Sequence, residues 1–269
     1  MAAPAQSRRS GTQSIERAIQ VLKEITGRSR FGWRPSDLAA RCSLDRGTTH
    51  RILACLVRER LVQQRRSDRH YVPGPLLFEM GLSTPSYTMF QAECQPILAR
   101  VAKRLQGYAL LCVRSGTDSV CVATAGARAY VGTAFDVGTR RSLTATATGV
   151  AILIAMPPAE REAVVAKLLN EGDGQARSKQ AFLRMWRKSV AAGFAVNQGY
   201  TARGVNAVGV PLNDASKYPF GSFTLAGDAV HLPAPRMTET AEILRREGLA
   251  IERLVRQAFP EGFYNAQSM

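Results

Sequence analysis

The stretch RPSDLAARCSLDRGTTHRILACLVRERL, residues 34–61, decides the fold of the first part of this chain. Ser36 and Asp37 supply polar and acidic groups at a helix start, where the first N–H groups need acceptors. Residues 42–44 break this helix, and Asp45 can cap a second one. The second helix carries apolar residues at helical spacing, which we expect to be buried: Ile52, Leu53, Leu56 and Val57. The stretch predicts two short helices joined by a tight turn.

The front of the second predicted helix carries hydrogen-bonding side chains. In a helix-turn-helix, the N-terminal residues of the second helix reach base edges in the major groove. An arginine there can bind guanine bidentately, which gives about 1–3 kcal/mol of discrimination, and threonines can contact bases or phosphates. An ordinary helical hairpin with a solvated polar face is the alternative. The candidate DNA-contacting residues are Arg46, Thr48, Thr49, His50 and Arg51.

A helix before this stretch and a hairpin after it complete a winged helix-turn-helix. Residues 14–26 predict a helix that Ser14 caps and Gly27 ends. We expect its buried face to consist of Ile15, Ala18, Ile19, Leu22 and Ile25. Two β-prone segments, 61–64 and 70–74, flank a polar turn. A solvated turn is the alternative to a DNA-contacting wing tip, for which the candidates are Arg65, Arg66 and Arg69.

The charge is concentrated in the same part of the chain. The net charge is +15 over 269 residues, a length that allows two domains. Residues 1–80 hold 15 Lys and Arg against 7 Asp and Glu, whereas the remaining 189 residues hold 21 against 14. The charge per residue is therefore more than twofold higher at the front, which favours phosphate binding because Lys and Arg displace condensed counterions. Affinity for membranes or for polyanions in general is the alternative.

Metal, cofactor and membrane roles find no support in the sequence. Five Cys lack metal-ligand spacing, and three scattered His make a zinc site unexpected, so we expect no metal and no cofactor. Cys112 and Cys121 face each other across a predicted hairpin, where we expect a reduced pair. The first 13 residues have no apolar signal core, and no run of about 18 apolar residues exists. We therefore expect a cytoplasmic protein that does not contact a membrane.

Beyond Tyr108 the pattern changes to short strands with helices between them. The β-prone segments are 109–113, 120–123, 129–134, 207–212 and 221–226, and the helical segments are 145–156, 159–169, 178–192 and 238–259, with 75–81 and 91–105 before them. The fold class is therefore α+β, with helices against an antiparallel sheet. The predicted organisation is a flexible tail (1–12), a winged helix-turn-helix domain (13–75), a linker (76–90) and an effector-binding and oligomerisation domain (91–269).

The order and spacing of several motifs resemble the IclR family of bacterial transcription regulators. The motifs are SIERAIQVLKEI (14–25), LAARCSLDRGTTHRILACL (38–56), HYVPGPLLFEMG (70–81), VGTRRSLTATATGVAILIAMP (137–157), GFAVNQGY (193–200), VNAVGVPL (205–212) and FGSFTLAG (220–227). The resemblance implies a winged helix, a helical linker, a GAF-like effector domain, and homodimers or dimers of dimers on palindromic operator DNA. The chain departs from the family at Gly47, where Ser is usual, at 142–144, where Pro-Leu-His is frequent, and at Val150, where Lys is frequent.

An effector site is predicted where residues 143–149 lead into a helix. The first N–H groups of a helix are unpaired and partly positive, which suits a carboxylate, and hydroxyls surround this start. The resemblance implies an opposite wall of Asn197, Asn206 and Thr224, and an apolar lining of Leu143, Ala147 and Val205. The candidate residues are Leu143, Thr144, Thr146, Ala147, Asn197, Val205, Asn206 and Thr224. A small organic acid fits such a site; threonines that only cap the helix, in a cavity filled by side chains, are the alternative.

These observations predict a DNA-binding transcription regulator, with repression favoured over activation, whose operator binding responds to a small organic acid. One alternative is an enzyme that acts on a small acid. The sequence shows no Ser/His/Asp constellation, phosphate loop or metal cluster, and we interpret Glu160, Glu162 and Asp228 as surface or capping residues. The other alternative is a ligand-sensing interaction module that does not bind DNA.

Overall fold

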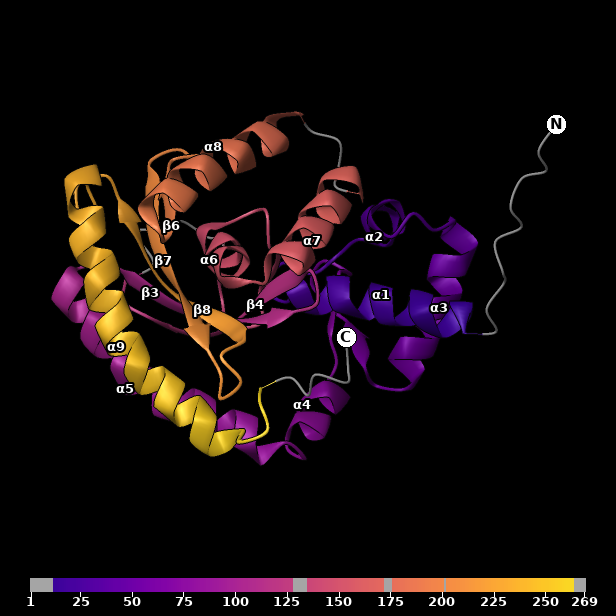
Figure 1. Cartoon of the computed structure of the whole chain (residues 1–269). Coiled ribbons are helices and arrows are strands. Elements are labelled where there is room, and N and C mark those ends of the chain that lie inside the picture. Colours follow the sequence, from indigo (N-terminus) through magenta and orange to yellow (C-terminus); the bar gives the residue numbers. More distant parts are fainter. Residues whose placement is uncertain (1–11, 128–134, 172–175, 201, 264–269) are drawn as a thin grey trace. The chain divides into compact units, whose positions relative to one another are not determined.

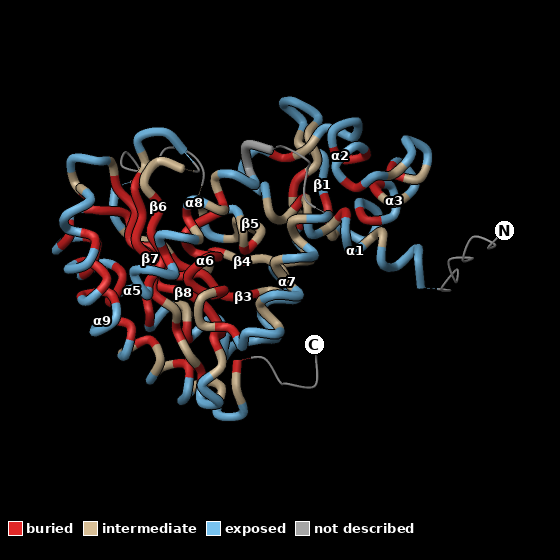
Figure 2. The backbone as a smooth tube through the Cα atoms, turned by 45° about the horizontal axis from the view of Figure 1, so that its top comes forward, coloured by how far each residue is buried: buried red, intermediate tan, exposed pale blue. Residues whose placement is uncertain are grey.

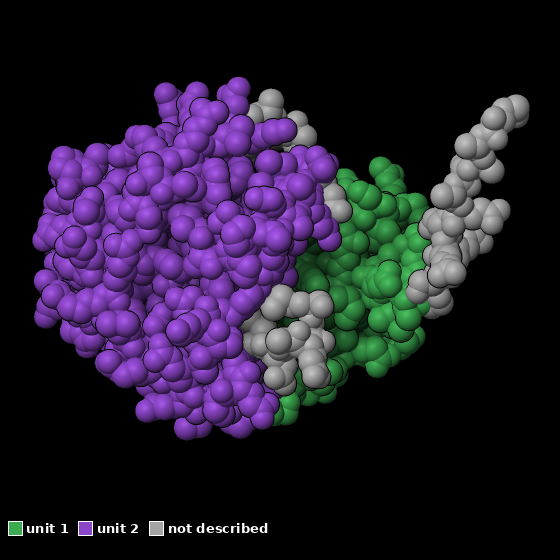
Figure 3. Space-filling model, viewed as in Figure 1, with its two compact units in different colours: residues 1–83 green, residues 84–269 purple. Residues whose placement is uncertain are grey.

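The chain folds into two compact units, residues 1–83 and 84–269 (Figures 1 and 3). The computed structural model describes residues 12–127, 135–171, 176–200 and 202–263. The tail predicted over residues 1–12 and the strand predicted over 129–134 lie outside these ranges, except for Thr12. No helix in the described ranges has the length and apolar character needed to cross a membrane.

In its described residues, the first unit combines four helices with a two-stranded wing. Its elements are α1 (Gln13–Gly27), α2 (Pro35–Arg41), α3 (Arg46–Arg58), β1 (Val62–Gln64), β2 (Tyr71–Pro73) and α4 (Pro75–Gly81). The strands β1 and β2 pair antiparallel, and Trp33 adds an isolated bridge to Tyr71. This confirms the winged helix-turn-helix that the sequence predicts.

The core of this unit uses only part of the apolar faces expected from the sequence. Val21 and Ile25 of α1 are buried, together with Leu53 of α3. In contrast, Ile15 is 62% exposed and Ile19 is 46% exposed, so the prediction that these two side chains are buried was wrong. The apolar positions of α1 extend over more of the helix surface than its partners within the unit cover. Helix α1 also begins one residue earlier than predicted, with Thr12 in the N-cap position.

In its described residues, the second unit is built on a six-stranded antiparallel sheet in the order β5-β4-β3-β8-β7-β6 (Figure 2). Its strands are β3 (Tyr108–Ser115), β4 (Asp118–Ala125), β5 (Arg140–Ser142), β6 (Ala195–Gln198), β7 (Val205–Asn213) and β8 (Pro219–Asp228). Its helices are α5 (Pro85–Leu105), α6 (Ala147–Ala155), α7 (Pro158–Glu171), α8 (Ala176–Ala192) and α9 (Met237–Ala258), and a 3-10 turn, Ala234–Arg236, precedes α9. The sequence did not predict the short strands β5 and β6, since each has only three or four residues.

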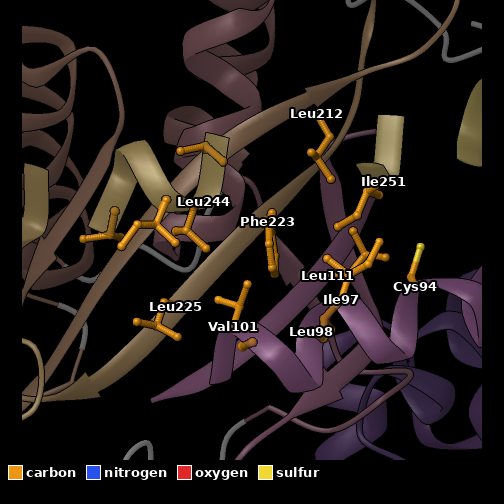
Figure 4. Packing of buried hydrophobic residues seen from close by; sticks show 14 of the residues in the cluster. Cys94, Ile97, Leu98, Val101, Leu111, Leu212, Phe223, Leu225, Leu244 and Ile251 are labelled. Carbon is orange, nitrogen blue, oxygen red and sulfur yellow. The ribbon is translucent and has the colours of Figure 1, made fainter. Parts of the chain in front are cut away.

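Helices cover both faces of the sheet, which is why strand β3 reads as a continuous apolar run (Figure 2). One face packs on α5 and α9, where Leu98 and Val101 of α5 lie near Phe223 and Leu225 of β8 (Figure 4). The other face packs on α6 and α8. Residues along a regular stretch of strand alternate between these two cores, and the register shift between β3 and β4 at Leu111 and Cys112 interrupts the alternation.

Aromatic rings join the start of α5 to the segment after α9. The ring centroids of Tyr87 and Phe259 lie 4.7 Å apart, and those of Tyr87 and Phe263 lie 5.4 Å apart. The Asp214 carboxylate, on the β7–β8 hairpin, accepts a hydrogen bond from the Phe263 backbone N–H at 3.2 Å. Residues from both ends of this unit therefore meet in one cluster.

Candidate functional site

The start of α3 is held by a side-chain cap, as the sequence predicts. The Thr48 backbone N–H donates to Asp45 Oδ1 at 2.8 Å. Hydrogen bonds from Thr48 lower the pKa of the Asp45 carboxyl below its usual range. A charged acceptor at this position compensates the unpaired N–H groups of the first turn. The cap from Asp45, the residue directly before α3, therefore fixes the orientation of the first residues of this helix.

Four of the five candidate residues on α3 remain accessible. Arg46, His50 and Arg51 are exposed, and Thr48 is half-buried. The Arg51 guanidinium donates to Thr48 Oγ1 at 3.2 Å, which holds the two side chains together on the helix surface. The front of α3 thus presents two arginines, a histidine and a threonine hydroxyl to solvent.

Thr49 is not accessible, and its prediction as a DNA contact was wrong. Its side chain is 1% exposed, and Oγ1 donates to the Asp45 backbone carbonyl at 2.9 Å. Residues 49, 53 and 56 follow the i, i+4, i+7 spacing of one helix face, and Leu53 and Leu56 are buried on that face. That spacing is the signal that would have placed Thr49 in the core. Val57, expected to be buried, is instead 39% exposed.

Arg65 fastens the wing to the rest of the unit. Its guanidinium forms a bidentate pair with Asp68, at 3.0 and 2.6 Å. It also donates to the backbone carbonyls of Arg30, at 3.1 Å, and of Phe31, at 2.9 Å. The Arg65 guanidinium lowers the pKa of the Asp68 carboxyl far below its usual range. Most of the Arg65 donors are therefore used within the protein, and its role as a phosphate contact stays a prediction.

The other two wing arginines are exposed. Arg66 lies at the wing tip, and Arg69 has a positive φ of 58°. The Arg69 carbonyl accepts a hydrogen bond from the Gln64 side chain at 2.9 Å. Next to the wing, a hollow of about 350 Å³ is lined by Arg28, Arg30, Phe31, Gly32, Trp33, Arg34, Asp37, Arg65, Asp68 and His70. The sequence prediction did not include Arg28 or Arg34.

In the second unit, the start of α6 is buried and capped by threonine. Thr146 is the N-cap residue, and its Oγ1 accepts from the Gly149 N–H at 3.3 Å. The hydroxyls of Thr146 and Thr148 lie 2.7 Å apart, and that of Ser119 lies 3.4 Å from Thr148. The helix begins at Ala147, two residues later than predicted. A small hydroxyl cluster therefore surrounds the first turn of α6.

Two of the polar residues predicted for the opposite wall share the α6 face of the sheet. Thr224 pairs with Gly209 across β7 and β8, and Asn197 pairs with Ala207, a residue of the α6-side core. Thr224 is 1% exposed, and its Oγ1 has no hydrogen-bond partner among the described residues. The Asn197 amide accepts from the Tyr200 N–H at 2.9 Å and thereby closes the turn after β6.

Asn206 lies on the other face, so its assignment to this wall was wrong. It pairs with Gly227 and has the same parity along β7 as Val208 and Val210, which belong to the core beneath α5 and α9. Its amide donates to the Leu232 carbonyl at 2.9 Å. Side chains of one strand alternate between faces, so a one-residue change in position moves the side chain to the opposite core.

The remaining candidates line the α6 side. Leu143 and Ala147 are buried, whereas Thr144 and Val205 are half-buried. The Thr144 hydroxyl lies 3.0 Å from that of Ser142.

Two thiols complete this face of the sheet. Cys112 and Cys121 are directly opposite each other across β3 and β4, as the sequence predicts, and both are free and buried. Contact with Cys121, together with burial, raises the pKa of the Cys112 thiol well above its usual value. Among the described residues, no cluster of His, Cys, Asp and Glu has the arrangement of a metal site.

Comparison with known proteins identifies both units. The IclR helix-turn-helix domain matches residues 14–66, and the C-terminal domain of bacterial transcriptional regulator IclR matches residues 86–253. The glycerol operon regulatory protein of Streptomyces coelicolor is 24% identical over 216 residues, which cover 80% of this chain and 84% of that protein. The HTH-type transcriptional regulator TsaQ1/TsaQ2 of Comamonas testosteroni is 25% identical over 249 residues, which cover 87% of this chain and 86% of that protein.

Solved structures share the fold over nearly the whole chain. An IclR family transcriptional regulator from Brucella abortus has a TM-score of 0.69 at 20% identity, over 93% of this chain and 95% of that one. An IclR homolog from Microbacterium hydrocarbonoxydans, solved in complex with 4-hydroxybenzoate, has a TM-score of 0.65 at 22% identity, over 91% of this chain and 100% of that one.

The similar proteins are regulators of transcription and not enzymes. The match to the C-terminal domain alone spans more than half of the 269 residues. With a helix-turn-helix unit followed by an effector unit, this chain belongs to the IclR family of bacterial transcriptional regulators.

Proposed function

We propose that this protein binds an operator through the front of α3 and the wing, represses transcription from it, and releases it in response to a small organic acid. The observation that carries the DNA-binding part is the capped start of α3, where Arg46, His50 and Arg51 are exposed together. An arginine in this position can read guanine through two hydrogen bonds. The exposed wing residues Arg66 and Arg69 supply the sequence-independent contacts to phosphate.

The proposal for an acidic effector rests on the α6 face of the sheet. The α6 N-terminus provides a partial positive charge, and the buried Thr224 hydroxyl is without a partner among the described residues. A buried hydroxyl without a partner costs free energy, which a ligand acceptor or donor would recover. The homolog from Microbacterium hydrocarbonoxydans was solved with 4-hydroxybenzoate, a small aromatic carboxylate. We extend that ligand class to this chain, with aliphatic acids as the second class to test.

The assembly we propose is a homodimer or a dimer of dimers in the cytoplasm. Two recognition helices related by a twofold axis would read half-sites about 34–36 Å apart, or at a multiple of that spacing. An effector that binds two arrangements of the dimer unequally shifts the population between them, whereas one with equal affinity for both changes nothing. Sedimentation of the protein with and without operator DNA tests the assembly.

Operator binding is tested by fluorescence anisotropy on the promoter next to the protein's own gene, with random DNA as the competitor. We expect Arg51→Ala to lose about 1–3 kcal/mol of operator affinity and to lower the ratio of operator to random binding. Arg58→Ala is the matched control, because Arg58 lies in the last turn of the same helix and pairs with Glu59 at 2.9 Å. Equal affinity of the unmodified protein for operator and random DNA at every salt concentration would contradict the proposal.

Effector binding is tested by thermal shift of the intact protein with benzoate-type and aliphatic carboxylates. A ligand at 100 times its Kd stabilises the folded form by about 2.7 kcal/mol. We expect Thr224→Val to reduce the response, whereas Thr240→Val, at a residue of α9 that is 3% exposed, leaves it unchanged. Operator DNA that stays bound when a stabilising acid is added would refute release as the mechanism. A promoter more active with the protein than without it would refute repression.

A further inference from the structure

The hollow beside the wing has a strongly basic lining. Four arginines, at positions 28, 30, 34 and 65, line it together with two aspartates, at positions 37 and 68. Asp68 is already neutralised by the bidentate pair with Arg65. Neither Arg28 nor Arg34 forms an ion pair with a carboxylate among the described residues, and both are exposed. Asp37 is the remaining carboxylate of the lining, so among these described residues the three arginines at 28, 30 and 34 outnumber the acidic groups that Arg65 does not neutralise.

The loop that carries these charges is held in one conformation. The backbone of Trp33 pairs with that of Tyr71 in both directions, at 3.0 and 2.9 Å, and the Trp33 indole N–H donates to the Glu24 carbonyl at 2.9 Å. The Arg28 guanidinium lies 5.0 Å from the centre of the Trp33 ring and 5.8 Å from that of Phe31. Stacking on these rings positions Arg28 before any ligand arrives, which lowers the entropy lost on binding.

The loop is also fastened to the wing. The Arg65 side chain starts in the wing turn and donates to the backbone carbonyls of Arg30 and Phe31. When the wing contacts DNA, residues 28–34 are therefore held next to the same DNA, because they are bonded to the wing. The exposed wing arginines, Arg66 and Arg69, lie in the turn that this contact holds.

The chemistry favours a polyanion over a small free anion as the occupant. Arg28, Arg30 and Arg34 are exposed, so water and salt screen a single ion pair there to a small free energy. A duplex instead presents phosphates at regular spacing, and each contact releases a condensed counterion, which is favourable at exposed sites. Arg28, which stacks on two rings, and Arg34, which is exposed at the start of α2, adjoin a basic wing and fit that partner.

We propose that the α1–α2 loop and the first turn of α2 form a third DNA-contacting element, in which Arg28 and Arg34 hold backbone phosphate on the flank of the operator. This inference rests on the proposed function, because it assigns a further contact to the same complex. The contact is independent of sequence, so it adds affinity and register without adding base readout.

The test uses the full-length Arg28→Ala/Arg34→Ala double variant and anisotropy between 50 and 200 mM salt, on operator DNA with long flanks and on random DNA of the same length. Each lost phosphate contact should reduce the slope of log K against log salt by about 0.9. For one contact, the affinity ratio of wild type to variant should therefore shrink about 3.5-fold over that salt range. The ratio of operator to random binding should not change.

The matched control is Arg246→Ala/Arg253→Ala, which removes the same charge from exposed positions on α9. It should leave the slope unchanged. A second variant, Arg28→Lys/Arg34→Lys, should restore most of the slope because it keeps the charge. Trimming the flanks of the operator should weaken the wild-type protein and leave the double-alanine variant unaffected. Thermal unfolding of each variant reports whether the first unit is still folded.

Three results would overturn the inference. One is a slope on random DNA that is the same for the folded double variant and the wild type. Another is an equal loss of affinity by both proteins on trimmed flanks. The third is a pair of observations: inorganic phosphate stabilises the wild type but not the variant, and the two proteins have the same slope of log K against log salt on DNA. That result would mean that the hollow binds a free anion. Failure of the proposed function looks different, because the wild type would then bind operator no better than random DNA, while the slopes on random DNA still report on this loop.

Discussion

Gly149 permits the close approach of α6 to the preceding loop, and replacing it tests that packing. A Cβ at this position would lie 2.5 Å from the Leu143 Cα and 2.6 Å from its carbonyl carbon, well inside the 3.4 Å at which ordinary contact begins. Both atoms belong to the backbone and cannot rotate away. We therefore expect Gly149→Ala to displace either the start of α6 or residue 143.

We expect Gly149→Ala to destabilise the protein, whereas Gly→Ala in a helix usually stabilises it. In an ordinary helix interior, Gly→Ala stabilises by about 0.8–1 kcal/mol. Overpacking a filled core destabilises by about 1–3 kcal/mol, and by more where the backbone must move. Combining about 3 kcal/mol of strain with about 1 kcal/mol of helix preference leaves a net loss of about 2 kcal/mol. For a unit of this size, the midpoint of thermal unfolding should fall by about 4–8 °C.

Gly248→Ala is the matched control within the same unit. Its added Cβ would meet only the end of the Leu212 side chain, at 3.0 Å, and that methyl group can move. We expect a change near zero or a small stabilisation. Calorimetry and urea unfolding of the intact proteins, monitored for the second unit, measure both. If Gly149→Ala were as stable as Gly248→Ala, the packing of α6 on Leu143 would be incorrect.

Three further predictions address the core, a buried ion pair and the thiols. Thr49→Val should lower the free energy of unfolding by about 1 kcal/mol, since it loses one buried hydrogen bond, and should leave operator affinity unchanged; a large loss of affinity in a stable variant would restore Thr49 as a DNA contact. Arg114→Met should destabilise by about 1–2 kcal/mol in urea unfolding, because it removes the 2.8 Å ion pair between Glu160 and an arginine that is 5% exposed and leaves Glu160 with only the Tyr218 hydroxyl as a donor among the described residues; equal stability of Arg114→Met and wild type would contradict this. Burial raises the pKa of the Cys94 thiol to about 12, so the native state keeps a proton that the unfolded chain loses above about pH 8.5. The free energy of unfolding should therefore fall as pH rises from about 9 to 12, and less steeply in Cys94→Ala; parallel pH profiles would refute the linkage.

The helix-turn-helix could be predicted because its signals are local. Asp45, the turn before it and the spacing of Leu53 and Leu56 lie within a few residues of one another, and caps and periodicity act over that range. The sequence prediction for Thr49 is wrong because it uses the chemistry of the hydroxyl group and not the angle of residue 49 around the helix. The spacing of residues 49, 53 and 56 already indicates that Thr49 lies on the buried face.

Other features depend on contacts between distant segments. The acceptors of Arg65 are backbone carbonyls more than 30 residues earlier in the chain, which no composition or spacing indicates. The face of the sheet on which Asn206 lies depends on the strand register. That register is set by the neighbours of β7 and not by the segment itself. Similarly, Ile15 and Ile19 fit an amphipathic pattern, but a pattern does not say how much of a helix its partners cover.

The aromatic cluster that joins Tyr87 to Phe259 and Phe263 has a consequence for how this protein can be rearranged. A polypeptide that enters and leaves a folded body at neighbouring points can be cut elsewhere and rejoined there with little disturbance of its interior. The effector unit is therefore suited to circular permutation through a short linker after residue 263, and to transplantation behind a different DNA reader by one splice near residue 84.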